Sequence, residues 1–107
     1  MNAERRMSEP TIALIIPTLH GASAALHASI ARQTVQPQQI EEVRGVRPNG
    51  RARNVGVAYT RGDILVFVDD DAVLGDAHVI ANLVAPLRDD ASIGVTGSAK
   101  LLPPNAP

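Results

Sequence analysis

Short apolar runs recur along the chain and alternate with stretches of helical composition. Their length and their continuous apolar character are typical of strands covered on both faces of a sheet. The run that ends at Val68 is the clearest, whereas Glu41, Glu42 and Arg44 interrupt an earlier one, and Pro17 is expected to end the first. The predicted strands are Thr11–Ile16, Ile40–Val46, Asp63–Val68 and Ile93–Ala99.

Three segments between these runs have the composition of helices with one apolar face. Ser23 and Asp76 are the predicted N-caps of the first and third, Gly62 is the expected stop after the second, and Pro86 predicts a kink or an early end in the third. The predicted helices are Ala22–Gln33, Arg51–Thr60 and Asp76–Arg88. Alternating strands and helices predict an α/β fold with a mainly parallel sheet and helices on both faces.

Composition indicates one ordered domain, because 45% of the 107 residues are hydrophobic and 20% are charged. We expect a flexible leader over residues 1–10, the folded domain over residues 11–100 and an extended, proline-containing tail over residues 101–107. No apolar run has the length of a membrane span, and a cytoplasmic location is expected. Only 2% of the residues are aromatic, so nucleic acid is not an expected partner.

Charge divides the chain into a basic stretch followed by an acidic one. The acidic part contains Asp69, Asp70 and Asp71, which come directly after the clearest strand. Ligands of parallel α/β sheets bind outside the carboxyl ends of the strands, where this triplet is expected to lie. Three adjacent carboxylates repel one another unless a cation disperses their charge, and oxygen donors without cysteine suit Mg²⁺ or Mn²⁺. The triplet therefore predicts a divalent metal site.

The basic part offers a second candidate site, for an anion. The segment Gly50–Gly56 places Arg51, Arg53 and Asn54 near the predicted start of the second helix. Backbone N–H groups and guanidinium groups at such a position favour phosphate. Together with the acidic triplet, this segment predicts a site that holds a metal ion and a phosphate side by side.

Other interpretations of these charges remain open. The triplet and the arginines could be solvated surface groups of opposite sign. A receiver-like phosphotransfer domain also places acids at strand ends, but it takes them from two strands and uses a distant lysine, whereas here the first two strand ends carry no aspartate and Lys100 is the only lysine. The serines lack the sequence context of a serine-hydrolase nucleophile.

An ordered series of short motifs resembles the nucleotide-binding half of the GT-A fold glycosyltransferases, in the large group similar to family 2. The resemblance extends over most of the chain and ends in a segment similar to the DxD signature of that family. The motifs are Ile15-Ile16-Pro17-Thr18, Gln33-Thr34 with Pro37 and Ile40, Gly50-Arg51-Ala52-Arg53-Asn54-Val55-Gly56, Arg61-Gly62-Asp63 and Phe67-Val68-Asp69-Asp70-Asp71.

The resemblance implies that the chain binds a nucleotide-diphosphate sugar, with a UDP-sugar as the first candidate, and that the sugar passes to an unidentified acceptor with inversion. Pro17 and Thr18 would lie near the base and ribose. Asp69 would contact the ribose and, with Asp71, the Mn²⁺ or Mg²⁺ ion that bridges the diphosphate, while Asp70 would help either. The remaining implied nucleotide contacts are Arg51, Arg53 and Asn54.

The chain departs from the family pattern at the second strand and in its length. Val43-Arg44-Gly45-Val46 stands where an acidic pair followed by Gly-Ser is common, and Leu19-His20 stands where Tyr-Asn is usual. Complete members continue into an acceptor-binding half that supplies a catalytic base, and no base is identified here. The alternative function is therefore a non-catalytic binding or interaction module of the same fold. An uncovered part of the sheet is expected to favour a homodimer or a partner chain.

Overall fold

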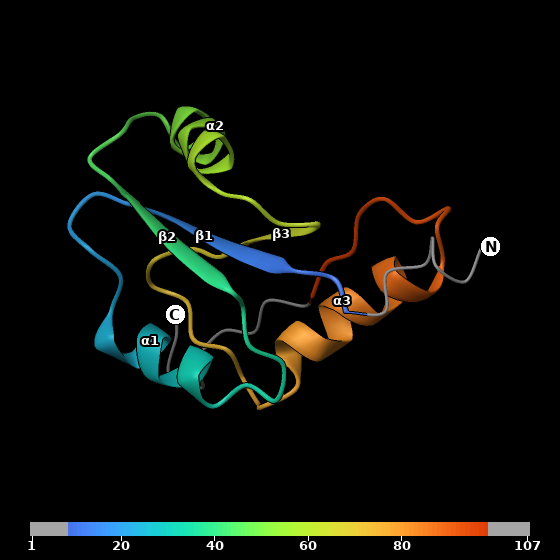
Figure 1. Ribbon diagram of the computed structural model, residues 1–107. Helices are drawn as coiled ribbons and strands as arrows, with labels where there is room; N and C mark the ends of the chain where they lie inside the picture. Colours follow the sequence, from blue (N-terminus) through green and yellow to red (C-terminus); the bar gives the residue numbers. More distant parts are fainter. Residues whose placement is uncertain (1–8, 99–107) are drawn as a thin grey trace.

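The computed structural model describes residues 9–98 and has a three-layered arrangement, with one sheet between helices (Figure 1). The strands are parallel in the order β2-β1-β3, so the predicted α/β fold with a parallel sheet is confirmed. Helix α2 covers one face of the sheet, and α1 and α3 cover the other. The elements are β1 (Ile12–Thr18), α1 (Ala24–Ala31), β2 (Gln39–Arg44), α2 (Asn49–Tyr59), β3 (Ile64–Phe67) and α3 (Val79–Asp89).

Strand β1 continues through Pro17 to Thr18, so the prediction that Pro17 ends the strand was wrong. The carbonyl of Ile15 accepts from Val68 N, which shows that the odd-numbered residues of β1 direct their backbone groups toward β3. Pairing with β3 ends at Ile15 and Phe67, whereas pairing with β2 runs on to Thr18 and Arg44. The missing N–H of Pro17 therefore points to a side where no strand partner is needed.

Local chemistry sets the other element ends. Ser23 is the N-cap of α1, as predicted, and its hydroxyl accepts from Leu26 N at 3.0 Å. The predicted extension of the second strand to Val46 was wrong, because Gly45 turns the chain with a φ of +73°. The predicted N-cap Asp76 was also wrong. Its carboxylate accepts from His78 N at 2.8 Å in the turn before α3, and His78 is the cap.

Helix α2 begins two residues earlier than predicted, with Pro48 as its N-cap, and ends at Tyr59, before Gly62. Pro86 lies inside α3 without ending it, since the helix continues to Asp89. Burial of Ile80 and Val84 in the core below β1 holds this helix in place. Tertiary packing thus outweighs the local cost of the proline.

The predicted fourth strand is not formed over residues 93–98, and Ala99 lies outside the described residues. This segment instead runs beside β3 and α3 and is tied to α3 by Thr96, whose hydroxyl donates to the carbonyl of Leu83 at 2.8 Å. A groove of about 590 Å³ separates it from β3. Within the described range, β3 is therefore an edge strand. Residues 1–8 of the leader predicted over residues 1–10, and the whole predicted tail at residues 101–107, also lie outside the described residues.

Strand β1 forms the centre of the core, because all seven of its residues are buried. On one face, Ile12, Leu14 and Ile16 pack with apolar residues of α1 and α3. On the other face, Ile15 packs with Val43 of β2 and Ala52 of α2. Helix α2 comes especially close to the sheet at Gly56, where a Cβ atom would overlap Ile15 Cγ2.

Substitution of Gly56 by alanine is expected to destabilise the fold by about 1–3 kcal/mol, because the added methyl group must displace Ile15 or the helix. Gly50→Ala in the same helix is the matched control, since a Cβ there meets open space. It is expected to be neutral or to stabilise by up to about 1 kcal/mol through helix propensity. Urea unfolding of both variants measures the difference, and equal stabilities would contradict this account of the packing.

Candidate functional site

A hollow of about 300 Å³ lies at the carboxyl edge of the sheet, where the parallel strands β1 and β3 both end. One wall comes from the end of β1, another from the loop after β3, and the first residue of α2 completes it. This is the edge at which α/β sheets bind ligands. The residues that line the hollow are Pro17, Thr18, Leu19, Asn49, Asp69, Asp70 and Asp71.

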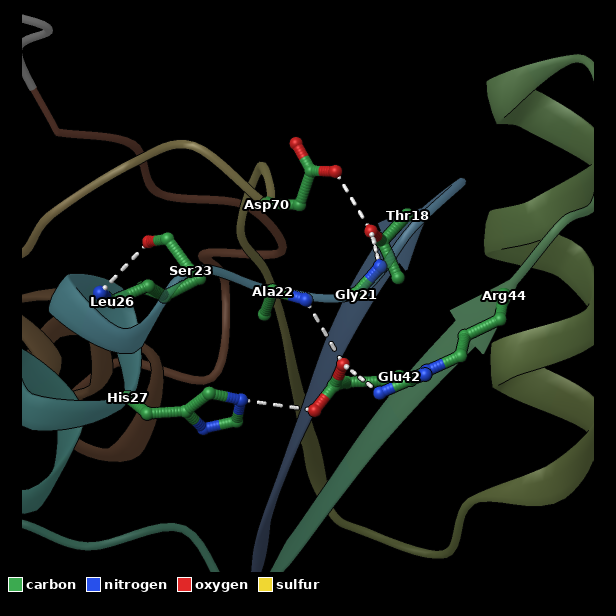
Figure 2. A network of polar contacts seen from close by, with 9 residues as sticks. All are labelled: Thr18, Gly21, Ala22, Ser23, Leu26, His27, Glu42, Arg44 and Asp70. Carbon is green, nitrogen blue, oxygen red and sulfur yellow. Dashed lines mark hydrogen bonds and ion pairs between the residues drawn. The ribbon is translucent and has the colours of Figure 1, made fainter.

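Thr18 and Asp70 join the two main walls. The Thr18 hydroxyl donates to Asp70 Oδ2 at 2.7 Å and accepts from the backbone N–H of Gly21 at 2.8 Å (Figure 2). The carbonyl of Asp70 accepts from Ser23 N at 3.2 Å, so the same residue also fixes the start of α1. Asp70 is half-buried, and one of its carboxylate oxygens is already engaged by the protein.

Asp69 and Asp71 have exposed side chains on the rim of the hollow. Across residues 9–98, no group of three or more histidine, aspartate or glutamate side chains is arranged to hold a metal ion. The acidic segment nevertheless presents two exposed carboxylates, those of Asp69 and Asp71, at the hollow. Such oxygen donors fit Mg²⁺ or Mn²⁺, which take their remaining ligands from water and substrate phosphates.

The predicted phosphate-binding residues of α2 do not line the hollow. Arg51, Arg53 and Asn54 are exposed on this helix, and Asn49 is the residue through which α2 reaches the hollow. The structure therefore brings together Pro17, Thr18 and the three aspartates, as the sequence indicated, and leaves the two arginines and Asn54 outside the hollow.

A second polar cluster holds the loop between β1 and α1. Glu42 of β2 accepts from the backbone N–H of Ala22 at 3.0 Å and from the Arg44 guanidinium at 3.4 Å, and its other oxygen lies 2.9 Å from His27 Nε2 on α1 (Figure 2). The Ala22 N–H, and with smaller effects His27 and Arg44, hold the pKa of Glu42 below its ordinary value of 4.5, against the opposing effect of burial.

The sequence matches the model of the family described as Glycosyl transferase family 2 over residues 16–101, a range that includes every residue lining the hollow. No curated protein and no solved structure matches the chain. The match covers most of the chain. The chain belongs to glycosyl transferase family 2.

Family 2 membership confirms the resemblance seen in the sequence and favours a glycosyl-transfer domain over a receiver-like one. The parallel sheet with helices on both faces is consistent with the N-terminal half of the GT-A fold that the resemblance implied. Within residues 9–98, no helix has the length and apolar character needed to cross a membrane.

Sequence reasoning missed Asn49, Leu19 and Glu42. Asn49 lies outside the predicted helix Arg51–Thr60, although Pro48 directly before it favours a helix start. Glu42 was regarded only as an interruption of a weak strand. A half-buried carboxylate in a strand needs hydrogen-bond donors or cations beside it. The position of Glu42 inside a predicted strand was therefore the signal in the sequence that it has such partners.

The lowered pKa of Glu42 predicts a pH dependence of stability. A carboxylate with a pKa lowered by folding stabilises the protein above its unfolded pKa, and this contribution disappears as the pH falls through the folded pKa. The free energy of unfolding of the wild type should therefore decline more steeply below pH 4.5 than that of Glu42→Gln. Urea unfolding across this range gives both curves, and all other carboxylates are common to the two proteins. Parallel curves would contradict the prediction.

Proposed function

We propose that this family 2 domain binds a nucleotide-diphosphate sugar, with a UDP-sugar as the first candidate, through Mn²⁺ or Mg²⁺. The observation that carries the proposal is the hollow at the carboxyl edge, where Pro17 and Thr18 face the acidic segment Asp69–Asp71 across a space of about 300 Å³. A cavity of this size is at the lower end of the range for small-molecule sites. Its acidic rim needs a cation before it can accept a diphosphate.

We assign different roles to the three aspartates on the basis of their contacts. Asp70 is engaged by Thr18, so we assign it to the nucleotide side of the site, where it holds the hydroxyl in place. Asp69 and Asp71, exposed on the rim, would hold the cation, and Asp69 would also contact the ribose. A bound cation would stabilise the negative charge that develops on the departing diphosphate.

Helix α2 would contribute polar groups beside the cation. Asn49 offers an amide to the hollow, and the exposed Arg51, Arg53 and Asn54 follow on the same helix. Guanidinium groups here would offset the acidic rim and attract the diphosphate. We therefore keep these three residues in the proposed nucleotide site, as contacts made by the ligand outside the hollow.

Sugar transfer, with inversion and to an unidentified acceptor, is the second part of the proposal. Its alternative is a module that binds the donor without turnover. An assay for UDP released from UDP-sugars in the presence of Mn²⁺ distinguishes the two. A cytoplasmic location stays a prediction from the sequence.

Replacement of Asp71 by alanine is expected to abolish Mn²⁺-dependent binding of UDP. The cation would lose a negatively charged ligand, and the water molecule that takes its place is neutral. Isothermal titration with UDP, with and without Mn²⁺, measures the loss, which should exceed about tenfold in Kd. Asp89→Asn, which removes one exposed charge at the end of α3, is the control and should bind as the wild type does. Equal affinity of Asp71→Ala and the wild type would count against the proposed site.

We further propose that a second copy of the chain covers the apolar side of β3. Leu65 and Phe67 are 37% and 45% exposed on the sheet face that α2 covers only over β1 and β2. Ile93 and Val95, in the segment across the groove, are exposed as well. An apolar surface next to an open strand edge is a common site of association.

Leu65→Lys is expected to shift the chain toward the monomer, because a charge in the apolar contact must be desolvated. Light scattering over a range of concentrations measures the effect. Val57→Lys on α2, where the valine is 41% exposed, is the control and should leave the mass unchanged. A wild type that stays monomeric at all concentrations would exclude this partner.

A further inference from the structure

The loop that connects β1 to α1 is held from outside the candidate site by Glu42. This side chain is 21% exposed and lies on β2, and its two oxygens contact the Ala22 N–H in the loop and the His27 ring on α1. One carboxylate thus fixes the loop relative to β2 and α1 (Figure 2). Hydrogen bonds to a charged acceptor are roughly twice as strong as neutral ones.

The loop transmits this hold to the hollow through Gly21, the residue before Ala22. The Gly21 N–H donates to the Thr18 hydroxyl, and the hydroxyl has one proton, which it donates to Asp70. A displaced Gly21 would free the hydroxyl to turn away from Asp70. Gly21 has a φ of +109°, a conformation that glycine adopts readily, so the loop conformation depends on contacts from outside the loop.

We propose that Glu42 is a positioning residue for the nucleotide site, which fixes the Ala22 backbone so that Thr18 is directed at Asp70. Glu42 does not line the hollow, so its effect passes entirely through the loop. The inference rests on the proposed function and adds a residue that controls affinity without contact with the ligand.

The test combines nucleotide titration with amide hydrogen exchange of the loop. Glu42→Ala is expected to weaken binding of UDP with Mn²⁺ about tenfold and to accelerate exchange of the Gly21 and Ala22 amides, since a charged hydrogen bond is lost. Glu42→Gln keeps an acceptor oxygen for Ala22 and should restore affinity to within about twofold of the wild type. Glu41→Ala, at the neighbouring position of β2, is the control and should change neither quantity.

His27→Ala provides a second variant in case Glu42→Ala does not fold. The histidine side chain is 44% exposed, so its loss spares the core. It removes one partner of Glu42 and should weaken binding by about threefold, with faster exchange at Ala22.

The outcomes separate the inference from the function on which it rests. Wild-type protein that binds no nucleotide would overturn the proposed function, and the role of Glu42 with it. If the wild type binds nucleotide and Glu42→Ala or His27→Ala binds it with the same affinity, the positioning role alone is overturned. This holds whether hydrogen exchange in the loop is faster or unchanged. If Glu42→Gln weakens binding as much as Glu42→Ala does, the positioning role is also overturned, because the hydrogen-bond acceptor for the Ala22 N–H would then not determine the affinity.

Discussion

The burial of β1 between two parallel neighbours is the constraint on which the rest of the structure depends. All seven residues of this strand are buried, and its alternate side chains anchor the cores on both faces of the sheet. Because all three strands run in one direction, Thr18, Arg44 and the acidic segment after Phe67 emerge at the same edge. A hollow at that edge is thus a consequence of how the core is formed.

Polar contacts then fix what the core leaves undetermined at this edge. Apolar packing places the strand ends, but it does not orient a hydroxyl or a carboxylate that lies beyond them. The bond from Thr18 to Asp70 joins the two walls, and Glu42 holds the loop between β1 and α1. Across the described residues, every buried side-chain nitrogen and oxygen has a hydrogen-bond partner. The edge is accordingly ordered by the protein's own contacts, whereas Asp69 and Asp71 stay exposed.

On the face of the sheet that packs against α2, β1 and β2 are covered, whereas β3 is not. The proposed association surface lies on this uncovered part of the face, apart from the hollow at the carboxyl edge. On the β1 and β2 side, α2 packs closely enough to require glycine at position 56. Over β3 this helix gives no such cover, and Leu65 and Phe67 are exposed. The hollow and the apolar face have different chemistry. The proposed ligand site needs charged groups, and the proposed association surface needs apolar contacts. The proposed ligand site and the proposed association surface therefore lie on separate parts of the chain.

The sequence by itself determined the class of fold, the family resemblance and the position of the acidic segment, because continuous apolar runs and the order of short motifs are local properties. It also predicted the N-cap at Ser23, whose hydroxyl accepts a hydrogen bond from the backbone N–H of Leu26, three residues later. Tertiary structure decided the rest. Pro17 stays in its strand because β3 ends beside it, and residues 93–98 form no strand although their composition favours one. Glu42 acquires its role only through Ala22 and His27, which lie 20 and 15 residues away in the chain. Contacts of that kind depend on how elements pack, and no local pattern records them.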